Sequence, residues 1–172
     1  LIPRLDVGED GTAALVWSRS NGLNTIAQAS VREPGKSFSA PVDLSAVGQN
    51  ATNPQVVVSQ DGSVTASWTR FNGTKTVIQS RTRPPAGTFG GVSTISLIAN
   101  HADYSQLASA PDGTVTAVWR QFDGLNTLVL AATRPTAGNF GSSTVLSTFG
   151  KDADPPQIAA SAQGVMTAVW PM

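Results

Sequence analysis

Few side chains in this 172-residue sequence are of the types that catalyse reactions or bind metals. The chain has no cysteine and a single histidine, His101. Disulfides and cysteine-bound zinc are therefore excluded, and one chain cannot build a site from several histidine ligands. Asp103, Asp152 and Asp154 occupy corresponding loops and carry the oxygen ligands that Ca²⁺ prefers, although no complete D-x-D-x-D-G loop accompanies them. Calcium is the one metal left open, and no other cofactor is expected.

Two aromatic and two basic side chains are the candidate ligand-binding residues. Phe71 and Phe122 each precede a predicted turn, where an exposed ring could stack on a sugar; packing against a neighbouring strand is the structural alternative. Arg83 and Arg134 end predicted strands and could bind an anion. Bonding to loop carbonyls, or covering an adjacent aromatic ring, is the alternative for both.

No residue is assigned a catalytic role. Glu9 and Asp10 are adjacent and could offer a carboxylate pair for acid–base chemistry. However, Asp61 and Asp112 repeat the position of Asp10, so a structural role in a turn explains that aspartate. Serines are abundant, but no G-x-S-x-G motif accompanies them.

A repeat organises the whole sequence. The octapeptide "DGTVTAVW" ends at Trp119, and near-copies end at Trp17, Trp68 and Trp170, always at intervals of 51 residues. Aspartate followed by glycine recurs at the same interval, and no insertion or deletion interrupts the pattern. A fixed period of this size indicates a repeat architecture.

Each repeat is predicted to contain four antiparallel strands. In the second copy, Asp61–Gly62 and Asn72–Gly73 predict tight two-residue hairpin turns, because both residues of such pairs tolerate positive φ. A Pro/Gly-rich stretch ends the third strand. The four strands are expected at residues 55–59, 63–71, 75–83 and 92–97.

This pattern predicts an all-β fold, a β-propeller-type array of four-stranded antiparallel blades. The blades are expected at about residues 1–50, 51–101 and 102–152, with a partial fourth blade at 153–172, all in one repeat domain. The four tryptophans are expected to be buried between neighbouring blades. A β-trefoil-like fold is the alternative, although it would stop at three units.

The repeat resembles those of secreted bacterial β-propeller proteins of the "PQVAVDPDGTAVAVW" type. The resemblance rests on "PQVVVSQDGSVTASW", residues 54–68, and "SQLASAPDGTVTAVW", residues 105–119. The repeat is more distantly similar to the Asp-box repeat of sialidases, S-x-D-x-G-x-x-W, from which it departs because its Asp and Gly are adjacent. The arginine trio and Tyr/Glu pair typical of sialidases have few counterparts here, since the chain holds one tyrosine, Tyr104, and two glutamates, Glu9 and Glu33.

The composition limits the function further. Charged residues make up 13% of the chain and the formal net charge is zero, so neither nucleic acid nor an anionic membrane is an expected partner. The resemblance implies an extracellular or cell-surface bacterial protein. The expected function is a non-enzymatic scaffold or binding module that recognises protein or glycan or assembles with itself. The alternative is a carbohydrate-active hydrolase or lyase of the sialidase-like propeller type.

The uncovered faces of the predicted terminal blades lead us to expect a partner. The chain begins with Leu1 rather than Met, and three blades and a half would leave apolar sheet faces bare. We therefore expect a homo-oligomer, or the remainder of a longer parent chain, to cover those faces.

Overall fold

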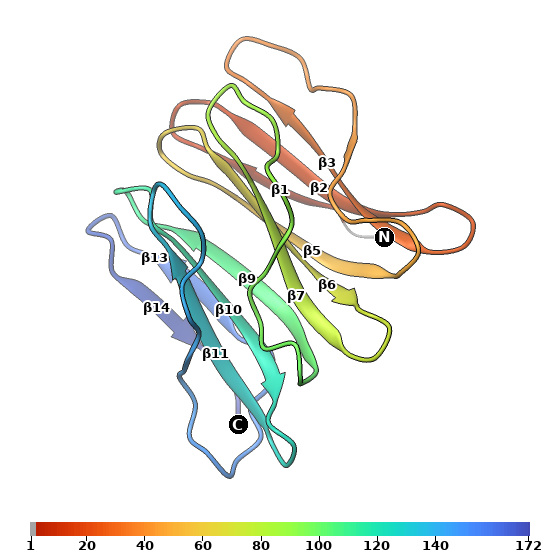
Figure 1. Cartoon of the computed structure of the whole chain (residues 1–172). Coiled ribbons are helices and arrows are strands. Elements are labelled where there is room, and N and C mark those ends of the chain that lie inside the picture. Colours follow the sequence, from red (N-terminus) through yellow and green to blue (C-terminus); the bar gives the residue numbers. More distant parts are fainter. Residues whose placement is uncertain (1–2) are drawn as a thin grey trace.

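The computed structural model describes residues 3–172 and contains strands but no helix in that range, so no helix there could span a membrane (Figure 1). Three sheets have four antiparallel strands in sequential order, and a fourth sheet has two. Blade 1 consists of β1 (Arg4–Val7), β2 (Ala13–Ser20), β3 (Thr25–Arg32) and β4 (Val42–Asp43). Blade 2 consists of β5 (Ala51–Val58), β6 (Val64–Phe71), β7 (Thr76–Arg83) and β8 (Ser93–Thr94). Blade 3 consists of β9 (Ala102–Ser109), β10 (Val115–Phe122), β11 (Thr127–Arg134) and β12 (Thr144–Val145). A separate half-blade consists of β13 (Gln157–Ala160) and β14 (Met166–Val169).

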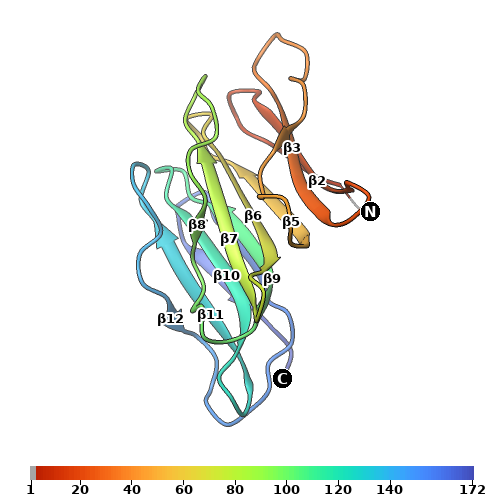
Figure 2. The ribbon, with the colours of Figure 1, turned by 45° about the vertical axis from the view of Figure 1, so that its right-hand side comes forward.

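The sheets stand side by side like the blades of a fan, as the two ribbon views show (Figures 1 and 2). The first strand of each blade is innermost: β1 contacts β5, β5 contacts β9, and β9 contacts β13. These four strands line the inner side of the array, and the last strand of each blade lies outermost. The arrangement is the predicted β-propeller array, and the prediction of an all-β fold is confirmed.

Each blade has two distinct ends. At the Asp–Gly end, a turn containing Asp and Gly joins the first strand to the second. At the crossover end, a hairpin joins the second strand to the third, and a longer crossover leads from the outermost strand to the next blade. Residues 44–50, 95–101 and 146–156 form these crossovers.

The Asp–Gly turns are longer than the two-residue turns predicted from the sequence. Ser59 donates its N–H to the carbonyl of Ser63 at 2.8 Å, and Gly62 donates to the carbonyl of Ser59 at 2.9 Å. Gly62 alone adopts a positive φ, of 80°, while Asp61 does not. The Asp61 carboxylate instead accepts the N–H of Ser63 at 2.9 Å, a contact that aspartate favours in turns. The prediction of a two-residue turn was wrong because it assigned Asp61 a positive φ, whereas Asp61 stabilises the turn through its carboxylate.

One polar side chain in each crossover caps the third strand of the blade it leaves. Asn50 and Asp152 each accept a strand N–H through Oδ1, and His101 accepts one through Nδ1. The donors are the threonines that begin β3, β7 and β11, at distances of 2.9, 3.2 and 2.8 Å: Thr25, Thr76 and Thr127. This shared contact explains why three different residue types stand at one repeat position.

Each central tryptophan packs against the preceding blade. Trp68 lies in a cluster with Val16, Ala29 and Leu44 of blade 1, and its exposed fraction is 0%. Trp119 is equally buried, against Ile78 and Ile95 of blade 2. These two tryptophans confirm the expected wedge between blades.

The first and last tryptophans are only half-buried, contrary to the expectation for all four. Trp17 belongs to blade 1, which has no blade in front of it among the described residues. Trp170 follows β14, whose sheet has only two strands. A tryptophan at this repeat position is fully buried only between two complete blades, and the described repeats at the two ends of the array lack one such neighbour.

Candidate functional site

The four predicted ligand-binding residues lie at opposite ends of the blades. Phe71 pairs with Thr76 at the crossover end of blade 2, and Phe122 has the same place in blade 3. Arg83 pairs with Val64 at the Asp–Gly end. The strand between these pairs has eight residues, which separates the two ends by roughly 20 Å. The structure therefore does not bring the two phenylalanines and the two arginines into one site.

Arg83 and Arg134 each contact nearby protein groups, but Nη1 of Arg83 and Nε of Arg134 are buried without a hydrogen-bond partner among the described residues. Arg83 donates through Nη2 to Glu33 at 2.6 Å. Arg134 donates to the carbonyls of Pro135 and Thr136 and to the Thr65 hydroxyl, and burial lowers the pKa of its guanidinium. Bonding to loop carbonyls was the structural alternative for these arginines, and Arg134 makes such contacts.

Protein contacts occupy the carboxylates of two of the three aspartates considered for calcium, Asp103 and Asp152. Both carboxylate oxygens of Asp103 accept from Arg120, and Asp152 accepts the N–H of Thr127. Asp154 uses its N–H to bond the carbonyl of Pro171. Within residues 3–172, no group of three or more His, Cys, Asp or Glu side chains is placed to hold a metal.

The innermost strands of blades 2 and 3 contain an irregularity that the repeat pattern did not predict. Asn53 and Tyr104 occupy the same repeat position and adopt φ of 50° and 52°, in the left-handed region that non-glycine residues rarely occupy. The pairing register of β5 shifts between Thr52 and Gln55, and that of β9 shifts at the same place. These shifts are β-bulges, which re-aim side chains and are common beside functional sites. A non-glycine residue held in this region lowers the stability of the fold by on the order of 1–3 kcal/mol. Two such residues at one repeat position therefore point to a functional reason for this conformation.

The bulged residues face a polar pocket at the crossover end, which we call the axial pocket. It has a volume of about 370 Å³ and is open to solvent. The three innermost strands β1, β5 and β9 supply most of its lining. The lining consists of Arg4, Ser18, Thr25, Thr52, Asn53, Pro54, Gln55, Tyr104 and Gln106. Amides, hydroxyls and one aromatic ring predominate, and no carboxylate lines the pocket.

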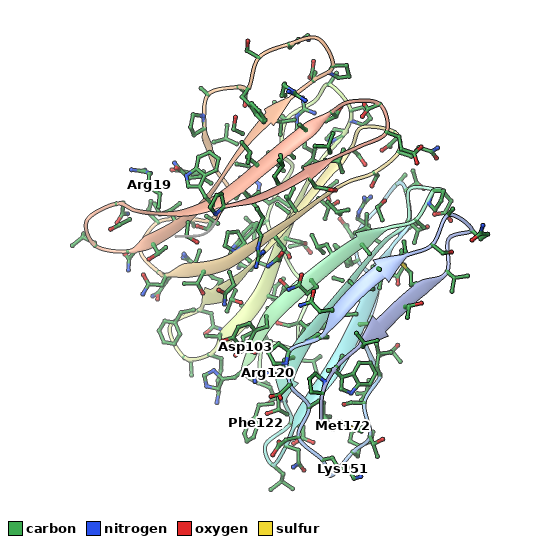
Figure 3. The ribbon with its side chains drawn as sticks, turned by 180° about the vertical axis from the view of Figure 1, so that it is seen from behind. Arg19, Asp103, Arg120, Phe122, Lys151 and Met172 are labelled. Carbon is green, nitrogen blue, oxygen red and sulfur yellow. The ribbon has the colours of Figure 1, made fainter. Side chains whose placement is uncertain are left out.

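Tyr104 is fixed by an ion pair behind its ring. The Cζ atom of Arg120 lies 4.9 Å from the ring centroid, within the range of a cation–π contact. Arg120 in turn donates through Nε and Nη2 to Asp103 at 2.9 and 3.0 Å, and this contact raises the pKa of the guanidinium. Figure 3 shows Asp103 and Arg120 next to each other on neighbouring strands. Tyr104 is still 42% exposed, so a molecule in the pocket can reach its ring.

Sequence reasoning missed this arrangement, although the repeat contains a signal for it. Asp103 and Arg120 stand where the preceding copy has Thr52 and Thr69, and both pairs are directly opposite each other on neighbouring strands. A threonine pair has thus been replaced by a charged pair beside the chain's only tyrosine. Searching for paired departures between repeat copies would have found it.

A second pocket lies on the inner side at the Asp–Gly end and has a different character. Its volume is about 450 Å³, and its lining includes two carboxylates, Asp6 and Glu9, both from blade 1. Asp6 accepts the N–H of Val58 at 2.7 Å, and Glu9 accepts from the Gln60 amide at 3.2 Å. The remaining lining residues are mainly Ala, Ser and Val.

Several solved structures are similar to this chain in fold. No family model matches the sequence, and no curated protein matches it. Among solved structures, an α-L-arabinanase of Penicillium chrysogenum, complexed with arabinobiose, is similar with a TM-score of 0.61 and 12% identity over 97% of this chain. An endo-arabinase from Bacteroides thetaiotaomicron is similar with a TM-score of 0.64 and 13% identity over 98% of this chain.

A third similar structure is an α-L-arabinofuranosidase of Fusarium graminearum with arabinobiose, with a TM-score of 0.58 and 12% identity. This chain spans 57%, 68% and 57% of the three neighbours' own lengths, in the order given. At these identities the likeness is one of fold, and it supports the β-propeller architecture.

Proposed function

We propose that this propeller array binds a carbohydrate in its axial pocket and does not cleave it. The observation that carries the proposal is the pair of bulged residues, Asn53 and Tyr104, held at positive φ on the wall of a polar pocket. Backbone strain of this kind persists only where the surrounding structure enforces it, and it is concentrated at functional sites.

The pocket offers the groups that bind sugars. Side-chain amides of Asn53, Gln55 and Gln106 can both donate and accept hydrogen bonds, as sugar hydroxyls do. The exposed part of the Tyr104 ring offers an apolar surface for the C–H face of a sugar ring. Because Arg120 and Asp103 hold the ring from behind, little side-chain freedom is lost when a ligand binds.

The same lining argues against hydrolysis in this pocket. Glycoside hydrolases of most families need two carboxyl groups flanking the scissile bond. No carboxylate lines the axial pocket, and the nearby Asp103 is bound through both oxygens to Arg120. Binding without cleavage is the function that these residues fit.

The nature of the neighbours guides the choice of first ligand. Two of the similar structures hold arabinobiose, and the three proteins are an arabinanase, an endo-arabinase and an arabinofuranosidase. We therefore propose arabino-oligosaccharides as the first probes, and a location outside a bacterial cell, where such glycans are met. The sequence resemblance to secreted bacterial propellers supports this location.

Isothermal titration calorimetry with arabinobiose and longer arabino-oligosaccharides tests the proposal. We expect binding that Tyr104→Gly weakens at least about tenfold, since a ring contact is lost. Leu23→Ala, at a loop tip with 92% exposure, is the matched control and should leave the affinity unchanged. Equal affinity in the Tyr104 variant would place any binding elsewhere.

A hydrolase remains the second candidate because of the pocket at the Asp–Gly end. That pocket contains Asp6 and Glu9, the two carboxylates that acid–base cleavage of a glycoside would need. A reducing-end assay on arabinan decides between the candidates. Activity that Glu9→Gln abolishes would support the hydrolase, and the absence of activity in a chain that binds the sugar would support binding alone.

A further inference from the structure

We infer that a small oxyanion, meaning a carboxylate, phosphate or sulfate group, binds beside Arg134 on the outer side of the array. The site is a pocket toward the Asp–Gly end, which we call the Arg134 pocket. Strand β7 and the loop before β8 of blade 2 meet the end of β11 and the loop before β12 of blade 3 there. Figure 2 shows these outer strands side by side. The pocket is separate from the axial pocket, and the inference does not depend on the proposed function.

Arg134 carries a buried charge that has no acidic partner. It is 2% exposed, and no ion pair joins it to an acidic side chain within residues 3–172. Nη1 donates to the carbonyls of Pro135 and Thr136, and Nη2 donates to the hydroxyl of Thr65. Of the five N–H donors of a guanidinium, the one on Nε is left without a partner among the residues that the structure describes. The negative charge of Asp61 offsets only part of the effect of burial, which lowers the pKa of the guanidinium.

The groove between blades 1 and 2 contains the acid that Arg134 lacks. Arg83, the counterpart of Arg134 one repeat earlier, is 8% exposed and donates through Nη2 to the Glu33 carboxylate of blade 1 at 2.6 Å. Blade 2 has Pro84 at the repeat position of Glu33. The buried arginine is thus kept in both grooves, whereas its carboxylate is present only in the first. Because an unpaired buried charge is costly, an anion from outside the chain would stabilise the second groove.

The lining of the second groove differs from that of the first in the same direction. Three apolar residues that line the first groove are replaced by hydroxyl residues or by glycine in the second. The replacements are Val31 by Thr82, Ala40 by Gly91 and Val42 by Ser93. Hydroxyl groups can donate hydrogen bonds to an anion, which valine cannot do.

Gly91 leaves open space in this lining. A Cβ atom at Gly91 would meet no atom of a residue beyond its chain neighbours within 4 Å, so close packing does not require glycine there. Gly91 is also not among the glycines that adopt a positive φ. The space that the counterpart Ala40 fills with a methyl group is therefore left to the pocket.

The size and charge of the pocket fit one anionic group. Its volume is about 110 Å³. This is the room of roughly three to four water molecules at ~30 Å³ each. None of the described residues that line it carries a carboxylate, and Asn139 adds an amide donor. Arg81 also lines the pocket, but its guanidinium donates to the carbonyls of Gly90 and Phe89, so Arg134 supplies the charge for the ligand.

A single substitution that restores the missing acid tests the inference. Pro84→Glu places a carboxylate where Glu33 stands in blade 1, and proline follows at both positions, Pro34 and Pro85. Isothermal titration calorimetry uses inorganic phosphate, sulfate and galacturonate as probes, at matched ionic strength. We expect the original chain to bind at least one of them, and Pro84→Glu to bind it at least about tenfold more weakly, because the new carboxylate occupies the arginine.

The choice of probes identifies the source of the anionic group. Tighter binding of phosphate or sulfate than of galacturonate would identify an inorganic ion, and the reverse order would identify an acidic sugar. Both results support a small oxyanion beside Arg134. Lys151→Ala is the control, since it removes an exposed positive charge outside the pocket and should leave the affinity unchanged.

Thermal melts provide a second readout. A probe at ten times its Kd should raise the melting temperature of the original chain by about 3–6 °C. Phosphate and sulfate also stabilise proteins in general because they are excluded from the surface. That general part should remain in Pro84→Glu, while the rest of the increase should be lost.

A milder variant keeps the inference testable if Pro84→Glu does not fold. Gly91→Ala copies Ala40 of the preceding repeat and narrows the pocket by one methyl group. We expect it to weaken probe binding at least about threefold, while the melting temperature without probe stays unchanged. Equal affinity in the original chain and in the folded variant, or no binding of any of the three probes to the folded original chain, would overturn the inference.

Discussion

Arg120 lies over the ring of Tyr104, with its Cζ atom 4.9 Å from the ring centroid and its guanidinium bonded to Asp103 on the same innermost strand as the tyrosine. This contact joins the strained backbone of β9 to its neighbour β10. It holds an exposed aromatic ring in one orientation beside the amides of the axial pocket.

The first prediction concerns Arg120 as a positioning residue. Arg120→Gln removes the ion pair with Asp103 and the contact with the ring, so Tyr104 gains rotational freedom. We expect the affinity for arabino-oligosaccharide to fall by about 3–10-fold, with a more unfavourable binding entropy. Calorimetry measures both quantities, and Arg120→Lys should recover part of the loss. An unchanged binding entropy would mean that Arg120 does not order the ring.

The second prediction separates function from stability at Tyr104. Tyr104→Gly relieves strain worth about 1–3 kcal/mol, but it loses a cation–π contact of about 0.5–1 kcal/mol and adds about 0.5–1 kcal/mol of chain entropy. These effects nearly cancel, so the free energy of unfolding measured in urea should change by less than about 1 kcal/mol. Sugar binding should nevertheless be lost. A loss of stability above about 2 kcal/mol would show that Tyr104 mainly serves the fold.

The third prediction compares two tryptophans of the same repeat position. Trp68→Ala removes a fully buried side chain from the interface of blades 1 and 2 and should cost about 3–5 kcal/mol of unfolding free energy. Trp17→Ala should cost less than half as much, because Trp17 is only half-buried. Equal losses in denaturant melts would contradict the assignment of Trp17 to an uncovered face.

Much of the fold could be predicted because the repeat marks it with recognisable residues. Asp–Gly and Asn–Gly pairs recur at turns, and tryptophan recurs at the interface between blades. The bulges could not be predicted, because Asn53 and Tyr104 adopt positive φ without the glycine that usually signals it. The half-burial of Trp17 could not be read from its own surroundings, which match those of Trp68, although the three and a half predicted blades already implied a bare face at the end of the array. The contact of Tyr104 with Arg120 is tertiary, and it leaves only the paired replacement of two threonines as a trace.

The fourth prediction concerns the polar caps of the crossovers. His101→Asn keeps an acceptor for the N–H of Thr76, as Asn50 does for Thr25, and should leave the melting temperature unchanged. His101→Ala removes the acceptor and should cost about 1 kcal/mol. Thermal melts of the two variants decide the matter. A loss in both would mean that the imidazole ring contributes more than its acceptor nitrogen.

The fifth prediction is a dependence of stability on pH at Asp123. Backbone N–H groups of Asn126 and Leu125 bond its carboxylate and lower its pKa below the ordinary value of 3.8. Because the folded-state pKa is lowered, the stabilisation is present above about pH 4 and is lost as the pH falls through the folded-state value. Asp123→Asn, which mimics Asn72 of the preceding repeat, should reduce this dependence in acid melts. An identical pH profile for variant and original would contradict the role of the carboxylate.

The most direct measurement is a glycan array that compares the original chain with Tyr104→Gly and with the control Leu23→Ala. We predict that the original chain and the control bind the same set of glycans, arabino-oligosaccharides among them. We predict that Tyr104→Gly, although folded, loses binding to that set. Failure of the folded original chain to bind any glycan, or retention of the full set by Tyr104→Gly, would contradict carbohydrate recognition in the axial pocket.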